Sequence, residues 1–204
     1  MTGNYHFSPC KAYRVKGESI GVWCAQDALV LKAMALVLSE YLSPKLSQDC
    51  YHIKGKGGSK AYVMTVKAET SQYRFVCRSD VNSYYASINH QILLKQLNMF
   101  IPDSKVMRLI ERMLTRLDDV NGQLYSIDIG INKGNPLSPL LGAVYLMPMD
   151  TRLSAFCRKQ NMRYYRYMDD WVILCKTRHQ LRHAVKIMNT CLEAVKQTKH
   201  PFKT

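Results

Sequence analysis

The chain has 204 residues, which is enough for one domain or for one domain and part of a second. Its composition, 47% apolar and 22% charged, is typical of a folded globular protein, and its ordinary counts of Gly and Pro exclude a collagen-like chain. No run of about 18 uncharged apolar residues occurs, so we expect no membrane partner.

The net charge is +14, and the excess of Lys and Arg is concentrated toward the end of the sequence. Residues 151–204 hold 12 Lys and Arg side chains but only 3 Asp and Glu side chains. A basic excess of this size indicates a polyanionic partner, most often a nucleic acid. The simpler alternative is an ordinary basic surface.

Seven cysteines are scattered along the sequence, and none of them forms a CxxC pair. A zinc knuckle or ribbon is therefore not indicated. Several cysteines stand in apolar runs, as buried free thiols do. Because the N-terminus also shows no signal-peptide pattern, we expect the protein in the reducing cytoplasm.

Hydrophobic periodicity and turn residues predict an α+β chain with a continuous core and no linker. We expect strands within residues 1–25, then a helix over 26–42 that stops near Pro44 and is buried around most of its circumference. Residues 54–60 (KGKGGSK) predict a basic glycine-rich loop without the Walker A spacing. A strand is expected over 61–66.

A second strand is expected over 73–81, followed by helices over 90–99 and 103–117. Asn121-Gly122 then predicts a hairpin, because both residue types accept the positive φ that a two-residue turn needs.

Residues 138–196 are predicted to form a helical region, a β-hairpin and a last helix. Residues 138–159 have helical composition, but Pro148 should kink or divide the helix. Residues 163–175 predict two strands around a central acidic pair, and a last helix is expected over 177–196. Its apolar side chains share one face: Leu181, Val185, Met188, Leu192 and Val195.

Three segments carry the side chains best suited to chemistry. Asp80 ends a predicted strand, residues 130–141 (GINKGNPLSPLL) form a loop that runs into a helix, and residues 167–170 (YMDD) lie between two strands. Adjacent Asp residues repel each other, so they are tolerated at a hairpin tip and become favourable when cations neutralise them. An isolated Asp-Asp turn is usually structural, but three carboxylates together can hold two Mg²⁺ ions for phosphoryl transfer.

These segments together resemble the fingers and palm of a reverse transcriptase, most closely the bacterial group II intron-like branch. Residues 167–170 match the family's YxDD motif, and Asp80 followed by Tyr85 matches the first catalytic aspartate and the aromatic sugar gate. Residues 130–141 match the family's GxPQGxxLSPLL segment. The resemblance runs from about residue 5 to residue 204, with all three motifs in the family's order.

The resemblance implies an α+β fold in which an antiparallel palm sheet packs on helices. It assigns fingers to residues 1–78 and palm to 79–204, with the helices within 89–128 shared between them. The sequence stops before a thumb would begin, so a chain truncated before the thumb is implied.

The resemblance also implies the catalytic residues. Asp80, Asp169 and Asp170 match the catalytic, metal-binding carboxylates, and the backbone carbonyl of Val81 would also face a metal ion. Two Mg²⁺ ions are implied, for which Mn²⁺ can substitute.

Nucleotide binding is implied for a second group of residues. Tyr85 matches the residue that stacks under the incoming sugar and leaves no space for a 2′-hydroxyl, while its alternative role is that of a core aromatic. Gly134 matches the glycine that permits close approach to the nascent base pair. Lys133, Arg14 and Lys16 are the basic candidates for the triphosphate, and each is alternatively a solvated charge.

Contact with primer and template is implied for Tyr167 and Met168, which would lie against the primer terminus. Arg178 and Arg182 of the last helix could line the nucleic-acid track, and the alternative is a solvated helix face. Arg78, two residues before Asp80, is expected either to form a local ion pair or to contact phosphate.

The sequence departs from the family pattern at two places. Asn132-Lys133 replaces Pro-Gln, which puts nucleotide selection in doubt. Residues 200–204 (HPFKT) resemble the start of the next motif, but Phe202 replaces its Asp. Without a thumb, we expect weak and poorly processive binding.

The expected function is that of a nucleotidyltransferase, an RNA-directed DNA polymerase that adds dNTPs to a DNA or RNA primer on an RNA template. A bacterial retroelement or an antiviral defence system is the expected setting. The alternative is a truncated nucleic-acid-binding remnant with weak or no activity. An RNA-dependent RNA polymerase is disfavoured because Tyr85 occupies the sugar gate.

Overall fold

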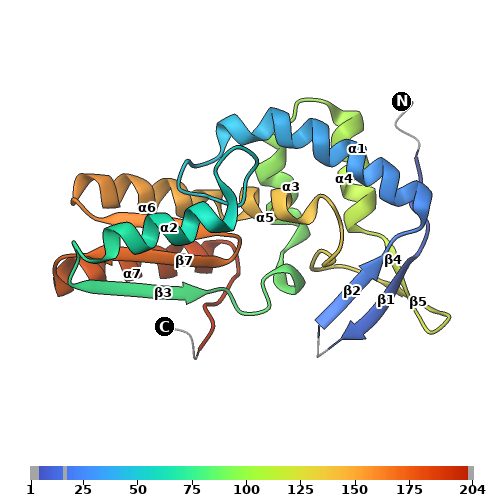
Figure 1. Cartoon of the computed structure of the whole chain (residues 1–204). Helices are drawn as coiled ribbons and strands as arrows, with labels where there is room; N and C mark the ends of the chain where they lie inside the picture. Colours follow the sequence, from blue (N-terminus) through green and yellow to red (C-terminus); the bar gives the residue numbers. More distant parts are fainter. Residues whose placement is uncertain (1–4, 16–17, 202–204) are drawn as a thin grey trace. The chain divides into compact units, whose positions relative to one another are not determined.

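The computed structural model describes residues 5–15 and 18–201, and the chain folds into two compact units (Figure 1). The first unit consists of Met1–Leu38 and Tyr85–Val144, and the second consists of Ser39–Tyr84 and Tyr145–Thr204. Both units combine helices with a sheet, which confirms the α+β class. Compactness does not by itself assign fingers and palm, so the expected division at residue 78 stays a prediction.

The first unit contains a four-stranded sheet in the order β2-β1-β4-β5. The central pair, β1 and β4, is parallel, whereas β1–β2 and β4–β5 are antiparallel. Asn121 and Gly122, both at positive φ, form the turn between β4 and β5, so the predicted hairpin is confirmed. The strands are β1 (Cys10–Val15), β2 (Glu18–Val22), β4 (Leu117–Val120) and β5 (Gln123–Ser126).

Helices α3 (His90–Asn98) and α4 (Ser104–Leu114) of the first unit confirm the two helices expected there. Each begins at a capping side chain. The Asn89 carboxamide oxygen accepts a hydrogen bond from the amide of Ile92, and the Asp103 carboxylate accepts one from the amide of Lys105.

Helix α1 (Ala25–Leu42) confirms the predicted helix but not its predicted burial. Leu31 is fully buried, whereas Leu29 is 72% exposed and Val37 is 67% exposed. The helix therefore buries one side only, and its apolar composition did not reveal this. No helix in the described ranges is long and apolar enough to cross a membrane.

The second unit contains an antiparallel sheet in the order β3-β7-β6, with β3 spanning Phe75–Asp80, β6 Arg163–Tyr167 and β7 Asp170–Cys175. The central strand β7 is buried from Trp171 to Cys175, because helices cover both faces of the sheet (Figure 1). Helix α2 (Gly58–Thr70) packs on the face formed by Tyr165, Val172 and Leu174. The other helices that pack on this sheet are α6 (Met147–Lys159) and α7 (Arg178–Ala194).

The predicted strand over 61–66 is wrong, because these residues lie inside α2. Side chains at 61–62, 65–66 and 69–70 are half-buried, and those at 63–64 and 67–68 are exposed. Burial thus repeats about every fourth residue, which is a helical period. The short apolar run AYVMTV is compatible with either structure, and packing on the sheet decides for the helix.

The division expected at Pro148 is confirmed. Helix α5 (Ser138–Tyr145) ends three residues earlier, and Pro148 stands in the first turn of α6, where its missing amide proton costs no hydrogen bond. The last helix, α7, is also confirmed. Thr177 and Gln180 form a capping box at its start.

Six of the seven cysteines are buried free thiols, as expected, and Cys24 is exposed. Burial raises the pKa of the Cys175 thiol to about 11, so this side chain stays protonated at neutral pH.

Candidate active site

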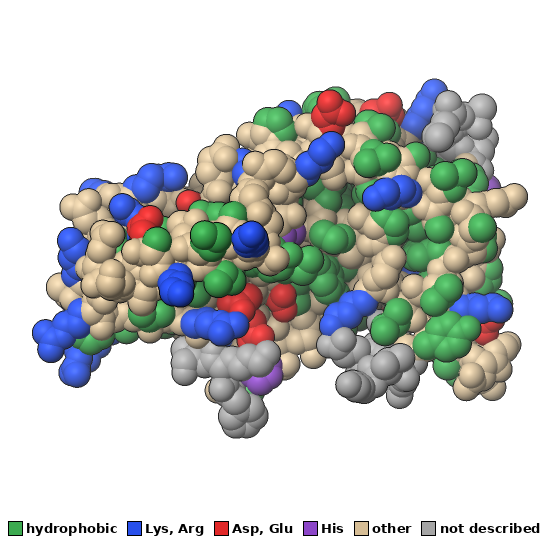
Figure 2. Space-filling model, viewed as in Figure 1, with side chains coloured by type: hydrophobic (Ala, Val, Ile, Leu, Met, Phe, Trp, Pro, Cys, Tyr) green, Lys and Arg blue, Asp and Glu red, His purple; other side chains and the backbone are tan. Residues whose placement is uncertain are grey.

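Two of the three expected catalytic carboxylates lie side by side on neighbouring strands of the sheet in the second unit. Asp80 is the last residue of β3 and pairs directly with Asp170, the first residue of β7. Opposite residues in an antiparallel pair carry their side chains on the same face, about 5 Å apart. In Figure 2, acidic side chains gather near this end of β3, and Lys and Arg side chains lie around them.

Asp169 lies in the turn that joins β6 to β7. The pairing of Tyr167 with Asp170 leaves only Met168 and Asp169 in the loop, so the predicted hairpin is confirmed. Met168 has a φ of 54°, a left-handed conformation that costs a residue with a side chain about 1–2 kcal/mol. A strained turn of this kind persists only where surrounding contacts hold it.

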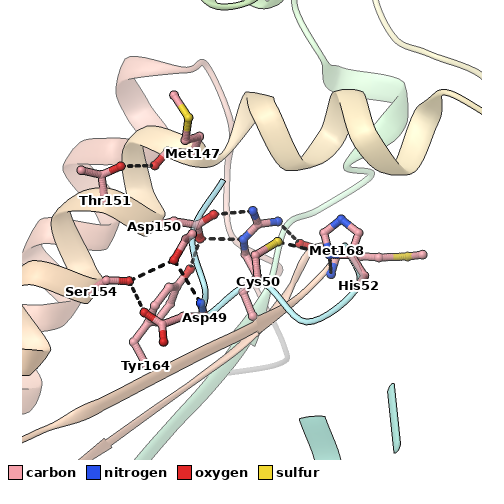
Figure 3. A network of polar contacts seen from close by, with 11 residues as sticks. Asp49, Cys50, His52, Met147, Asp150, Thr151, Ser154, Tyr164 and Met168 are labelled. Carbon is pink, nitrogen blue, oxygen red and sulfur yellow. Dashed lines mark hydrogen bonds and ion pairs between the residues drawn. The ribbon is translucent and has the colours of Figure 1, made fainter. Parts of the chain in front are cut away.

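Contacts of this kind are present on both sides of Met168 (Figure 3). Its amide donates a hydrogen bond to Nδ1 of His52 at 2.8 Å, and its carbonyl accepts one from Nη1 of Arg166 at 2.5 Å. No sequence pattern singles out His52 or Arg166 as functional residues, because neither belongs to the YxDD motif.

Arg166 is fully buried and forms an ion pair with the equally buried Asp150 of α6. Nε of Arg166 lies 2.7 Å from Oδ1 of Asp150, and Nη2 contacts the second carboxylate oxygen. The hydroxyl of Tyr164 donates to the same carboxylate at 2.7 Å. Burial and the Asp150 charge raise the pKa of Tyr164 well above its usual value, so the hydroxyl remains a donor.

Arg78, two residues before Asp80 in the sequence, forms an ion pair with Asp170. Nη2 of Arg78 lies 2.7 Å from Oδ2 of Asp170, and Nε lies 3.4 Å from Oδ1. The hydrogen bond to Asp170 raises the pKa of Arg78. We expected Arg78 either to form a local ion pair or to contact phosphate. The structure contains an ion pair, and its partner, Asp170, is one of the metal-binding candidates.

A distant segment of the chain runs beside Asp80. The amide of His200 donates to the Asp80 carbonyl at 2.8 Å, and the amide of Asn82 donates to the Thr198 carbonyl at 2.9 Å. Val81, whose carbonyl is a metal-ligand candidate, forms an antiparallel bridge with Lys199. No local pattern predicted this pairing, because more than a hundred residues separate the two segments.

The donor set fits a hard divalent cation in its chemistry, because Mg²⁺ prefers carboxylate and carbonyl oxygens. In the described part of the chain, no three His, Cys, Asp or Glu side chains are gathered closely enough to hold a metal ion. Asp170 instead neutralises its charge on Arg78. The Arg78 guanidinium would therefore compete with a cation for the Asp170 carboxylate.

The nucleotide-binding candidates Tyr85, Lys133 and Gly134 all belong to the first unit. Tyr85 is half-buried, and its carbonyl accepts a hydrogen bond from the amide of Ile131 at 2.8 Å. The structure therefore brings the start of the loop 130–134 against Tyr85.

Asn132 and Lys133, which depart from the family pattern, are anchored in this unit. The side chain of Asn132 is buried, and its Nδ2 lies 3.2 Å from Sγ of Cys10. The carbonyl of Lys133 accepts a hydrogen bond from the amide of Gly21 at 3.2 Å. Gly134 has a φ of 97°, and a Cβ there would lie 3.0 Å from the Gly21 carbonyl, so glycine is required.

For the basic side chains expected to contact triphosphate or nucleic acid, the structure gives less support. Lys16 lies outside the described residues, as does the side chain of Arg14. Arg178 and Arg182 are exposed on α7, and the Arg178 guanidinium lies 6.0 Å from the centre of the Phe75 ring. Phe75 begins β3 and Asp80 ends it, which separates them by about 17 Å at 3.3 Å per residue. The structure thus does not bring Arg178 together with the carboxylates.

Comparison with known families decides the family. The chain matches the family described as reverse transcriptase (RNA-dependent DNA polymerase) over residues 20–204. The chain belongs to the reverse transcriptase family. Its sequence is 24% identical over 154 residues to the group II intron-encoded protein LtrA of Lactococcus lactis, covering 72% of this chain and 26% of the relative. It is 23% identical over 160 residues to protein YkfC of Escherichia coli, covering 72% and 42% of the two chains.

Two solved structures are similar to this chain in fold. Apo telomerase from Candida tropicalis matches with a TM-score of 0.60 at 12% identity, covering 95% of this chain and 50% of that chain. A partial Cas6-RT-Cas1–Cas2 complex matches with a TM-score of 0.51 at 22% identity, covering 94% and 34%. The chain spans less than half the length of the curated relatives LtrA and YkfC.

The packing of Asn132 predicts a specific coupling with Gly21. A Cβ on Gly21 would lie 1.7 Å from Nδ2 of Asn132, so Gly21→Ala should destabilise the protein by about 1–3 kcal/mol through overpacking. In an Asn132→Ala background the same substitution should cost less, because the two nearest clashing atoms, Nδ2 and Cγ, are gone and only the Cβ of residue 132, at 2.9 Å, remains. Urea denaturation of the four proteins measures the coupling, and equal costs in both backgrounds would contradict the predicted clash.

Proposed function

We propose that this reverse transcriptase family member catalyses RNA-directed DNA synthesis by two-metal phosphoryl transfer. The observation that supports it most directly is the register of β3 and β7, which pairs Asp80 with Asp170, with Asp169 in the adjoining turn. Three carboxylates at one end of a rigid sheet are suited to metal-assisted attack on phosphorus.

In the proposed reaction, the primer 3′-oxygen forms a bond to the α-phosphorus of a deoxynucleoside triphosphate. The bond between the α-phosphorus and the bridging oxygen breaks, and pyrophosphate leaves. Asp80, Asp169 and Asp170, with the Val81 carbonyl, would hold two Mg²⁺ ions, for which Mn²⁺ can substitute. Bound ions of this kind lower the pKa of the attacking hydroxyl and neutralise charge on the leaving pyrophosphate.

Substrate selection is assigned to the first unit. We propose that the Tyr85 ring lies under the sugar and excludes a 2′-hydroxyl sterically. Gly134 would allow close approach of the nascent pair, and Lys133, Arg14 and Lys16 would contact the triphosphate. The buried position of Asn132 supports the assignment of Lys133 rather than Asn132 to this role.

A third group of residues is proposed to bind the primer and the template. Tyr167 and Met168 of the turn would contact the terminus of a DNA or RNA primer that is paired with an RNA template. Arg178 and Arg182 would contact the nucleic-acid backbone away from the carboxylates. The group II intron-encoded relative supports a bacterial retroelement as the setting, with antiviral defence as the alternative and the cytoplasm as the location.

One observation favours a second candidate function, that of a nucleic-acid-binding remnant. The Arg78 guanidinium already neutralises Asp170, and a carboxylate satisfied in this way does not need a metal ion. Removal of a metal-binding carboxylate distinguishes the two candidates. An RNA-dependent RNA polymerase stays disfavoured because of Tyr85.

The first prediction from this proposal concerns primer extension. The purified chain should extend a DNA primer on an RNA template with dNTPs and Mg²⁺, and Asp169→Ala should lower the rate by about 10³-fold or more because charge stabilisation of several kcal/mol is lost. Gel-resolved extension products provide the measurement. A folded wild-type chain without extension, and with a melting temperature that Mg²⁺ does not raise, would support the remnant instead.

The sugar gate gives a second prediction. Tyr85→Ala should lower the preference for dNTPs over NTPs by about 10- to 100-fold, since removing a steric contact is worth about 1–3 kcal/mol of discrimination. The ratio of kcat/KM for dATP and ATP on one template measures this preference. Tyr125→Ala, the same change at a half-exposed tyrosine of β5, is the control and should leave the ratio unchanged. An unchanged ratio in Tyr85→Ala would assign the discrimination elsewhere.

The Arg78–Asp170 ion pair gives a third prediction. Arg78→Gln should tighten Mg²⁺ binding by up to about fivefold, because the guanidinium no longer competes for the carboxylate and an exposed pair is worth at most about 1 kcal/mol. The dependence of the melting temperature on Mg²⁺ concentration, fitted with the linkage between binding and unfolding, measures the affinity. Arg74→Gln removes an equal charge near the other end of β3 and is the matched control. Equal effects of the two variants would refute a specific competition.

A further inference from the structure

A short segment of the second unit runs parallel to the edge of β6. The amide of Arg166 donates to the Asp49 carbonyl at 2.8 Å, and the amide of Tyr51 donates to the Arg166 carbonyl at 2.8 Å. This parallel pairing places Arg166 opposite Cys50, with its backbone hydrogen-bonded to Asp49 and Tyr51. Continuing the same parallel register by two residues places His52 opposite Met168, where the hydrogen bond between them is found.

His52 and Arg166 hold the two polar backbone groups of Met168. Nδ1 of His52 accepts the amide proton at 2.8 Å, and Nη1 of Arg166 donates to the carbonyl at 2.5 Å. Both partners lie outside the two-residue loop. Because one contact fixes each side of the residue, the peptide planes before and after Met168 are both constrained.

The two partners are themselves held in place. Arg166 cannot turn away, because Asp150 binds its guanidinium through two nitrogens. The His52 ring lies against the Tyr167 ring, with centroids 5.9 Å apart at 71°, and its Nδ1 also lies 3.4 Å from Sγ of Cys50. Figure 3 shows His52 and Met168 side by side at one end of this network.

The hydrogen bond fixes the form of the imidazole. The amide of Met168 is a donor, so Nδ1 of His52 acts as the acceptor and the ring proton lies on Nε2. An asparagine side chain offers an acceptor oxygen near the position of Nδ1, whereas leucine fills similar space without one. This difference allows the hydrogen bond to be tested apart from the volume of the side chain.

We infer that His52 is a positioning residue for the catalytic turn: with Arg166, it holds Met168 in its left-handed conformation and so fixes Asp169 beside Asp80 and Asp170. This inference rests on the proposed function, in which those carboxylates act. No motif of the sequence includes His52. The YxDD turn thus depends on a side chain more than a hundred residues earlier in the chain.

The loss of the His52 contact should act on the rate rather than on binding. Without the acceptor, the Met168 peptide is free to relax from its strained conformation, and the following carboxylate moves with it. A displacement of about 1 Å at a reacting centre can cost up to about 10²-fold in rate. Binding of the primer–template also uses contacts outside the turn, such as those proposed for Arg178 and Arg182, and should change less than the rate.

The experiment compares His52→Leu with His52→Asn in the full chain. We expect single-nucleotide addition in His52→Leu to lose about 10- to 100-fold in kcat, with KM for dNTP and the melting temperature close to wild type. His52→Asn should recover most of the rate, because it restores the acceptor. His183→Leu, a change at an exposed histidine of α7, is the control for loss of an imidazole and should retain the wild-type rate.

A second measurement does not depend on activity. In protein labelled with ¹⁵N-methionine, the Met168 amide, assigned from the signal missing in Met168→Leu, should exchange with solvent slowly in the wild type and in His52→Asn but rapidly in His52→Leu. Equal exchange in all three proteins, or a wild-type kcat in His52→Leu, would overturn the inference.

The two measurements also separate this inference from the proposed function. A wild-type chain without Mg²⁺-dependent extension would refute the proposed function, while the exchange rates would still report whether His52 holds the turn. An active wild type with an unprotected Met168 amide would refute the role of His52 alone.

Discussion

The buried ion pair between Arg166 and Asp150 is the interaction on which the carboxylate-bearing end of the second unit depends. It joins strand β6 to helix α6, and the same guanidinium reaches the turn through the Met168 carbonyl. Removing one partner of a buried pair leaves an uncompensated charge and commonly costs about 3–5 kcal/mol. Substitution of either Arg166 or Asp150 alone should therefore destabilise the core of the second unit. The position of the turn depends on this core, because Arg166 also contacts the Met168 carbonyl.

Local patterns in the sequence were sufficient to predict most of the elements. The hairpin around Asp169 was predictable because apolar strands flank two polar residues, and the break at Pro148 followed from the missing amide proton. The segment 61–66 was predicted wrongly because six apolar and β-branched residues fit both periods. Only the sheet that packs against Tyr62 and Val66 resolves that ambiguity, and the sheet is made by distant residues.

The candidate site was predictable in part, and the limit has a physical cause. The sequence motifs identified Asp80, Asp169 and Asp170, and the strand register brings Asp80 opposite Asp170. The partners of these residues were not predictable. A hydrogen bond between distant residues, such as that from the Met168 amide to Nδ1 of His52, produces no repeating pattern in the sequence. The two units were missed for a similar reason, since the chain passes between them inside α1, between Tyr84 and Tyr85, and near the end of α5, and not through a linker.

The interleaved order of the two units has a consequence for synthesis of the chain. The second unit contains residues on both sides of 85–144, so the pairing of β3 with β7 must close a long loop and is non-local and slow, whereas the β6–β7 hairpin is local. The backbone beyond β3 acquires its partner last, because residues 198–200 must leave the ribosome before they can pair with residues 80–82. A nascent chain can therefore complete the first unit while the carboxylate end of the second unit is still without its last backbone partner.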